Sequence, residues 1–405
     1  MRLIIEILIF LTCFINYKIW LLSIADWALL ALNAIALAAG ARFWSSPVKK
    51  AAGMLMAAGL FLSLAANFWK PYFSMGQFFQ SSVKLLIYIF SIGILPGFLK
   101  EKRIGLAGVL KHYIYLTCFS ALFQHAAVRL FGRESWPLYS MGSIFFGYMT
   151  DTSMFASGGI MRARTFYMEP GPMAVHISML FALLLFTEKK IPVRLHIAYL
   201  FCAVSTLSFS AIATVCCVYA AYFVELKYRK HVLRLAAGSM ALLVFLAVLY
   251  CSSDYIQNRV MRMVRMEDYS AVLRTFGTFH ALLDAPWYGV GAGNHAAYFM
   301  RFGKTEWYNG TGEFYNVIIL SALTMGYLGM AGLLLYQYYF LKQRPKLLFV
   351  FLVTQGGWGY LFSTPVWVFL ILGSVLISYA DSGIKPLCWK KIRGTGFSGK
   401  VIRIR

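Results

Sequence analysis

Long apolar runs follow one another along almost the whole chain, separated by short charged stretches. A transmembrane helix needs about 20 mostly apolar residues, and most of these runs approach that length. They predict twelve spans, near residues 3–16, 19–40, 51–69, 83–99, 106–130, 172–187, 195–208, 211–226, 235–251, 315–341, 347–361 and 366–381. We therefore expect an all-α polytopic membrane protein, with residues 1–405 forming a single integral membrane domain.

The composition supports this class. Of the 405 residues, 60% are hydrophobic and only 13% are charged, and a water-soluble chain cannot bury that much apolar surface. A nucleic-acid-binding domain, a secreted disulfide scaffold and a large soluble catalytic domain are excluded. The seven cysteines show no CxxC spacing, so we expect neither a disulfide framework nor a metal site.

The distribution of basic residues predicts the orientation. Of the 38 lysines and arginines, 25 fall near the N-terminus, in every second connector or in the tail 385–405. The positive-inside rule places these segments in the cytoplasm, with both termini. Two long connectors, 131–171 and 252–314, then lie on the outer side. The net charge of +23 follows from this topology and does not indicate a nucleic-acid partner.

The basic residues on the outer side are mostly arginines. Nine of the thirteen are arginine, whereas the inner set has fifteen lysines and ten arginines. A guanidinium can bind a phosphate through two parallel hydrogen bonds, which an ammonium cannot do. The cluster favours phosphate binding at the outer face. For any single arginine, pairing with an outer acid or a lipid headgroup is the simpler interpretation.

The first outer segment ends in a basic pair followed by Glu169 and Pro170. The pair is Arg162 and Arg164, and the next span begins just after it. Proline suits the first turn of a helix, and a helix N-terminus favours anions. The segment therefore predicts a phosphate-binding site at the membrane surface.

The second outer segment contains three glycines around a turn, Gly289, Gly291 and Gly293, followed by His295. Glycines permit backbone conformations in which the main chain can approach a ligand closely. Earlier in this segment, arginines alternate with apolar residues at helical spacing over 256–265. That pattern predicts either a helix lying in the membrane interface or a helix packed over the bundle.

Four segments carry a recognisable set of motifs. They are RARTFYMEP, with Arg162, Tyr167, Glu169 and Pro170 in the matching places; LSFSAIAT at 207–214; the stretch from Arg274 to Asn294; and YNVIILSALTMGYLG at 315–329, with Asn316, Gly326 and Gly329 matching. In this order they resemble the motifs of the bacterial O-antigen polymerase and O-antigen ligase superfamily. Tyr315 stands where many members, the ligases especially, have histidine, and Ser210 lacks the arginine that often follows it in ligases. These departures favour the polymerase branch.

The resemblance implies a GT-C-like membrane glycosyltransferase of the bacterial inner membrane, with the long loop 252–314 in the periplasm. Its donor is an undecaprenyl-diphosphate-linked oligosaccharide, and it needs no metal or other cofactor. A polymerase transfers the growing glycan onto a new lipid-linked repeat unit of an O-antigen, capsule or exopolysaccharide. The expected partners are this substrate, membrane lipids and a chain-length regulator, with no nucleic acid.

The resemblance and the chemistry together suggest roles for residues. The departing diphosphate gains negative charge, which fixed guanidinium groups stabilise; the candidates are Arg162 and Arg274, supported by Arg164 and Arg265. The acceptor hydroxyl must lose a proton, for which the competing residues are His295, Glu169 and Glu313. Candidate sugar-binding residues are Tyr167, Asn294, Tyr315 and Asn316, although Asn316 could equally cap a helix.

Two alternatives remain. An O-antigen ligase would transfer finished glycan to lipid A-core. A lipid-linked oligosaccharide flippase or other secondary transporter also fits twelve spans with both ends inside. Against a transporter, the sequence shows neither an internal repeat nor paired glycine- or proline-broken spans in matching halves.

Overall fold

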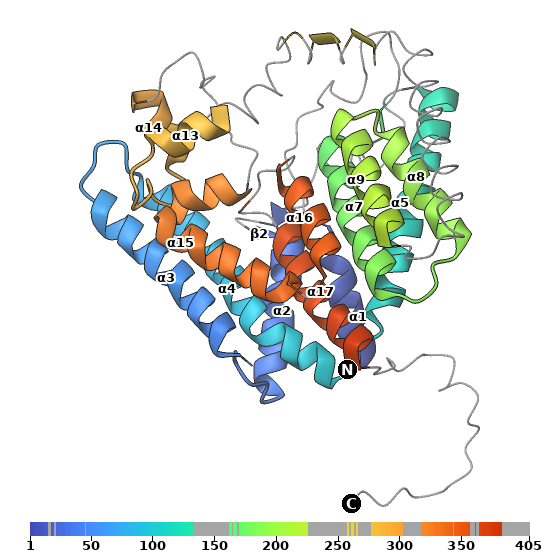
Figure 1. Ribbon diagram of the computed structural model, residues 1–405, viewed down its shortest axis with the longest axis horizontal. Coiled ribbons are helices and arrows are strands. Elements are labelled where there is room, and N and C mark those ends of the chain that lie inside the picture. Colours follow the sequence, from blue (N-terminus) through green and yellow to red (C-terminus); the bar gives the residue numbers. More distant parts are fainter. Residues whose placement is uncertain are drawn as a thin grey trace, which may run out of the picture.

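The computed structural model describes most of the chain. The described residues are 1–14, 18–19, 22–44, 46–132, 162–163, 165–167, 170–225, 257–258, 261–262, 265, 277–302, 317–342, 344–356, 361 and 364–382. Helices dominate this part of the chain (Figure 1). The predicted span 235–251 and the basic tail 385–405 lie outside the described residues.

The helices before the first long connector are α1 (Arg2–Leu11), α2 (Ile24–Ala38), α3 (Pro47–Asn67), α4 (Met75–Glu101) and α5 (Leu106–Phe131). A short antiparallel pair, β1 (Lys18–Ile19) and β2 (Leu22–Ser23), precedes α2. The later helices are α7 (Pro170–Thr187), α8 (Val193–Ser205), α9 (Phe209–Glu225), α13 (Thr278–Asp284), α14 (His295–Phe302), α15 (Val317–Leu341), α16 (Pro345–Gly356) and α17 (Thr364–Ser382).

The fold is that of an all-α membrane protein. Among the described residues, six helices are long and apolar enough to cross a bilayer: α3, α4, α5, α7, α15 and α17. Apolar helices of 10–17 residues lie in α2, α8, α9 and α16. Most predicted spans agree with a helix to within a few residues. The largest shift is at α4, which begins at Met75 after the N-cap Ser74, eight residues before the predicted start.

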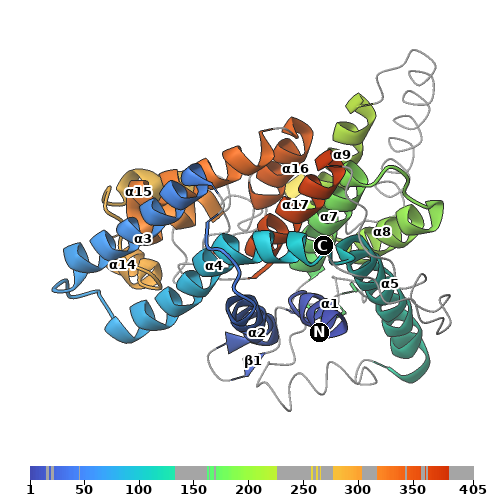
Figure 2. The ribbon, with the colours of Figure 1, turned by 90° about the horizontal axis from the view of Figure 1, so that it is seen from below.

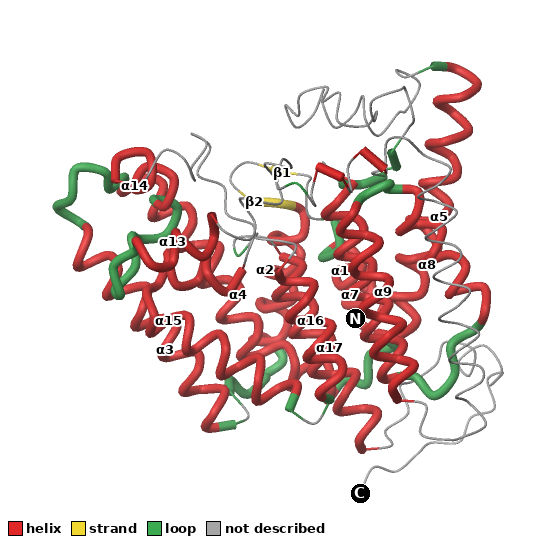
Figure 3. The backbone as a smooth tube through the Cα atoms, turned by 45° about the horizontal axis from the view of Figure 1, so that its top comes forward, coloured by secondary structure: helices red, strands yellow, loops and turns green. Residues whose placement is uncertain are grey.

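The bundle has two sides that meet at α7 and α17. On one side α3 lies along α15, and α4 packs against α2 and α17. On the other, α5 packs against α8, and α7 packs against α8 and α9. The three backbone views agree that α3, α14 and α15 lie at one end of the molecule and α5 and α8 at the other (Figures 1, 2 and 3).

Glycines allow α3 and α15 to approach closely. A Cβ atom on Gly59 would lie 2.4 Å from the carbonyl oxygen of Met325, and one on Gly332 would lie 2.7 Å from that of Ala52. Larger residues would force the two backbones apart. Small residues are the usual means of packing helices inside a membrane, where burial from water no longer drives association.

Helix α15 is broken at Gly326, where φ is 69°. The main chain of the loop between α13 and α14 pairs with the backbone groups at the break. The Val290 N–H donates to the Leu323 carbonyl oxygen (2.7 Å), and the Tyr327 N–H donates to the Trp287 carbonyl oxygen (2.8 Å). In a bilayer such groups must find partners within the protein, so the loop stabilises the break.

Asp26 is a buried acid inside an apolar run, and its side chain bonds to the start of its own helix and to α4. Its side chain accepts a hydrogen bond from the Ser23 N–H (2.8 Å), while the Ser23 hydroxyl accepts one from the Asp26 N–H. The Tyr88 hydroxyl donates to the other carboxylate oxygen (2.6 Å). This capping box begins α2 at Ile24, which is why the helix starts later than the predicted span at 19.

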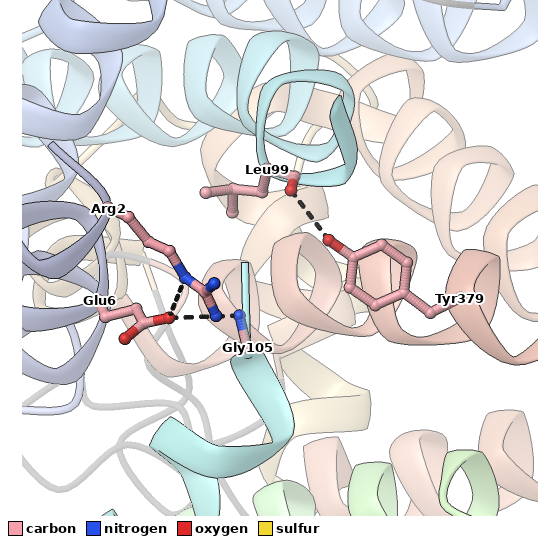
Figure 4. Close-up of polar contacts among 5 residues, drawn as sticks. All are labelled: Arg2, Glu6, Leu99, Gly105 and Tyr379. Atoms are coloured by element: carbon pink, nitrogen blue, oxygen red, sulfur yellow. Dashed lines mark hydrogen bonds and ion pairs between the residues drawn. The ribbon is translucent and has the colours of Figure 1, made fainter. Parts of the chain in front are cut away.

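A polar cluster joins the start of α1 to the connection between α4 and α5 (Figure 4). Arg2 Nε donates to Glu6 Oε1 (2.9 Å), and the Gly105 N–H donates to the same oxygen (3.4 Å). Beside them, the Tyr379 hydroxyl of α17 donates to the Leu99 carbonyl oxygen (2.9 Å). Three parts of the chain are thus held together at the end of the bundle that we predict to be cytoplasmic.

Candidate functional site

The first motif segment bonds to residues just before the second, and the third segment bonds to the fourth. The Ala163 N–H donates to the Ser205 carbonyl oxygen (2.8 Å), which joins the first segment to the helix end just before the second. The third segment meets the fourth at the break in α15, through the bond between Val290 and Leu323. We call the first junction the arginine site and the second the glycine loop, residues 286–294.

In the arginine site, the Arg162 guanidinium is held through its Nε atom. Arg162 Nε donates to the Thr206 carbonyl oxygen at the C-terminal end of α8 (3.2 Å), and the side chain is half-buried. Nearby, the Thr165 N–H donates to Gln124 Oε1 of α5 (3.2 Å). The segment is thus fastened to α8 and to α5 just before α7 begins at Pro170. A guanidinium oriented by the protein suits an anion chemically.

Tyr167 faces the interior of the bundle. It is 3% exposed, and its hydroxyl lies 2.7 Å from the Tyr113 hydroxyl and 2.7 Å from Nδ1 of His176. The Tyr113 hydroxyl also donates to the Cys13 carbonyl oxygen (3.1 Å). In this arrangement Tyr167 connects the arginine site to α5 and α7, so its contacts fit positioning better than sugar binding.

The three glycines of the glycine loop all have positive φ, of 77° at Gly289, 90° at Gly291 and 76° at Gly293. On each glycine, the side where a Cβ atom would lie faces other parts of the protein. Added Cβ atoms would lie 2.5 Å from the Gly326 nitrogen, 2.7 Å from the Phe73 ring and 2.6 Å from the Ser81 hydroxyl oxygen, respectively. The close approach that glycine permits is therefore made to α15, to the α3–α4 turn and to α4.

Asn294 and His295 lie where the glycine loop becomes α14. Asn294 is fully buried, and its Oδ1 accepts a hydrogen bond from the Ser74 N–H (2.6 Å), while its Nδ2 donates to the Ala292 carbonyl oxygen (3.1 Å). Its amide therefore joins the loop to the start of α4.

Burial lowers the pKa of His295 from its ordinary value of 6.5 to about 4. The imidazole is neutral at neutral pH but a weak base.

His295 and Arg162 belong to different parts of the fold. The loop before His295 packs on α4 and α15, whereas Arg162 contacts the end of α8. In Figure 1, α14 lies at upper left and α8 at right, and the other views agree (Figures 2 and 3). The structure does not bring this histidine within hydrogen-bonding reach of the arginine site.

The other candidate residues are described in part or not at all. Arg265 is exposed, and its N–H donates to the Met261 carbonyl oxygen (2.9 Å), a helical spacing that agrees with the predicted periodicity of 256–265. The candidates outside the described residues are Arg164, Glu169, Arg274, Glu313, Tyr315 and Asn316.

The sequence interpretation overlooked Tyr113 and His176. Both lie in apolar runs, and nothing in their spacing links them to Tyr167. Only the packing of α5 against α7 brings the three side chains together.

In comparisons with protein-family models, with curated proteins and with solved structures, nothing matches this chain.

Proposed function

We propose that this chain is a membrane glycosyltransferase that polymerises undecaprenyl-diphosphate-linked oligosaccharide repeat units at the periplasmic face of a bacterial inner membrane. The proposal includes a topology of twelve spans with both termini in the cytoplasm, and a fold like that of GT-C membrane glycosyltransferases. The observation that carries it is the Arg162 guanidinium of the first motif segment, whose Nε donates to the Thr206 carbonyl oxygen directly before the second motif segment begins at residue 207.

The chemistry requires such a group. In the transfer, the bond between the anomeric carbon and the diphosphate oxygen of the donor breaks, and an acceptor hydroxyl oxygen forms the new bond to that carbon. The diphosphate leaves with increased negative charge. A guanidinium already oriented by the protein stabilises this charge more in the transition state than in the ground state.

The acceptor proton must go to a base near the same site. His295 suits this role poorly because it lies beside α4, in a different part of the fold from Arg162. Glu169 directly precedes Pro170, the first residue of α7. We therefore favour Glu169 over His295 and retain Glu313 as a second candidate.

The direct test supplies purified protein in detergent with lipid-linked repeat units alone. We expect a ladder of longer lipid-linked glycans together with released undecaprenyl diphosphate. Absence of both products, under conditions in which the protein stays folded and monodisperse, would exclude the polymerase. In the host, loss of a polymerase leaves lipid A-core with one repeat unit, whereas loss of a ligase leaves bare core.

One observation favours a second candidate, a flippase for lipid-linked oligosaccharides. Broken membrane helices often form the substrate sites of transporters, and α15 is broken at Gly326. However, the main chain of 287–290 forms hydrogen bonds with the backbone at this break. Among the described helices, α15 is the only candidate span that is broken. Transfer of repeat units across sealed vesicles without polymer formation would select this candidate.

A further inference from the structure

A group of large apolar side chains is exposed around α13 and α14. We call it the aromatic rim; its members are Phe68, Trp69, Phe279, Leu283, Trp287, Met300 and Phe302. Trp69 is 87% exposed and Trp287 is 62% exposed. Large apolar side chains exposed together on neighbouring elements are unfavourable in water and mark a contact with a membrane or another protein.

Hydrogen bonds attach α13 and the residues after it to a candidate span, α15. The Tyr327 hydroxyl donates to the Leu282 carbonyl oxygen (3.3 Å), and the Tyr327 N–H donates to the Trp287 carbonyl oxygen (2.8 Å). Tyr327 directly follows Gly326, the break in α15, a helix long and apolar enough to cross a bilayer. The rim is therefore attached to a candidate span, although the sequence places it in a connector.

The rim is also held rigidly. The Tyr298 hydroxyl of α14 donates to the Asp284 carbonyl oxygen of α13 (3.0 Å), and the Tyr298 ring packs against the Tyr72 ring with centroids 5.1 Å apart. The Tyr72 hydroxyl donates to Asn67, whose Nδ2 donates to the Gly289 carbonyl oxygen (3.0 Å). These bonds join the rim to α3 and to the glycine loop. The exposed face of the rim is therefore formed before any partner binds.

The surroundings of the rim indicate what covers it. Its Phe68 continues the exposed face of α3, on which Phe61 is 72% exposed and must face lipid if α3 spans the membrane. Basic groups flank the aromatic side chains: Lys70 is exposed, and the Arg301 guanidinium lies 5.7 Å from the Phe302 ring centroid. Aromatic rings beside lysine and arginine are typical of residues at the boundary between acyl chains and headgroups.

We propose that the aromatic rim binds phospholipid at the acyl–headgroup boundary of the surrounding leaflet, so that α13 and α14 lie in the membrane interface as a docked pair of helices. The rim side chains contact acyl chains, and Lys70 and Arg301 contact headgroup phosphates. The surface is distinct from the arginine site and does not depend on the proposed glycosyl transfer. It fixes the depth of the glycine loop, because Trp287 belongs to both.

The test uses the intact protein in vesicles of phosphatidylethanolamine and phosphatidylglycerol. A fraction of the lipid carries a photoactivatable diazirine on the acyl chain near the glycerol, and adducts are mapped by mass spectrometry. We expect adducts on peptides from 279–302 at a yield comparable with that on the Phe61 peptide. Hydroxyl radicals generated in the water should oxidise Met300 much less than in the unfolded chain.

Two variants sharpen the test. The double variant Trp287→Ser, Phe302→Ser should lose lipid adducts on 279–302 and keep those on α3, whereas Phe61→Ser should leave the adducts on 279–302 unchanged. The proposal is overturned if native 279–302 carries no lipid adduct while the Phe61 peptide does. It is equally overturned if, in a parallel sample, a bifunctional photo-cross-linker joins 279–302 to a second copy of the chain.

Discussion

The hydroxyl oxygen of Tyr167 lies 2.7 Å from Nδ1 of His176, in the interior of the bundle and five residues after Arg162. With Tyr113 as its other neighbour, this hydroxyl joins the motif segment to α5 and α7. The motif tyrosine therefore fastens the segment that carries Arg162 to the interior of the bundle.

Replacing Tyr167 with phenylalanine should loosen this connection. The variant removes the hydroxyl that bonds to Tyr113 and His176 inside the bundle. Loss of a partner for buried polar atoms lowers the free energy of unfolding by about 1–3 kcal/mol. We expect a lower thermal unfolding midpoint in detergent. Tyr115→Phe is the matched control on α5, because the Tyr115 hydroxyl has no hydrogen-bond partner among the described residues. Equal midpoints for the two variants would contradict the assignment.

Arg162 should not tolerate lysine. An ammonium keeps the charge but loses both the planar fork and the Nε bond to the Thr206 carbonyl oxygen. We expect Arg162→Lys to reduce polymer formation nearly as much as Arg162→Ala, by on the order of 10-fold or more, or at least about 1.4 kcal/mol in the barrier. The control is Arg129→Lys, at an exposed arginine near the end of α5. Full activity of Arg162→Lys would rule out bidentate binding of the diphosphate.

Gly326 should not tolerate a side chain. A Cβ atom there would lie 2.6 Å from the Trp287 carbonyl oxygen, and φ of 69° is strained for any other residue. We expect Gly326→Ala to destabilise the protein by about 1–3 kcal/mol, seen as a lower yield of monodisperse protein and a lower unfolding midpoint.

Gly108→Ala provides the control for that substitution. Gly108 lies in α5, and a Cβ atom there would meet nothing within 4 Å. Alanine should be neutral or stabilising by up to about 1 kcal/mol at such a helical position. If both alanine variants behave alike, the close contact between the glycine loop and α15 does not occur.

Burial of His295 should make stability depend on pH. Because the pKa of His295 is about 4 in the folded protein and ordinarily 6.5, the unfolded chain takes up the proton first as the pH falls. The stability present above pH 6.5 is then lost between about pH 6.5 and 4, by at most about 3 kcal/mol, and partial exposure reduces this amount. We expect His295→Gln to lose less stability than the native chain when unfolding is measured at pH 7 and pH 4.5. Parallel losses in the two proteins would show that this imidazole is not the group responsible.

The sequence predicted the candidate site in part. Arg162 and Pro170 were identified correctly as belonging to a segment that ends where a span begins, because proline and polar residues at the edge of an apolar run indicate a helix start. The pairing of Arg162 with Thr206 could not be predicted. It depends on α8 ending beside α7, and a carbonyl oxygen at a helix end leaves no pattern in the sequence.

The glycine loop illustrates the same limit. Gly289, Gly291 and Gly293 suggested close approach of the main chain to a ligand, yet the described contacts are with protein. Positive φ can be anticipated from glycine spacing, because only glycine adopts it freely. What approaches the backbone depends on residues more than 200 positions away, such as Phe73 and Ser81.

The sequence by itself determined that apolar runs form helices, since a segment in lipid must satisfy its own backbone hydrogen bonds and a helix does so locally. It predicted twelve spans, and six of them correspond to described helices long and apolar enough to cross a bilayer. Only the tertiary structure decided that α15 breaks at Gly326 and that α13 lies beside it. The physical reason is that a break inside a membrane helix is stable only when another segment pairs with the exposed backbone groups. Here that segment, Trp287 to Val290, is distant in sequence, and it meets the break only once the chain is folded.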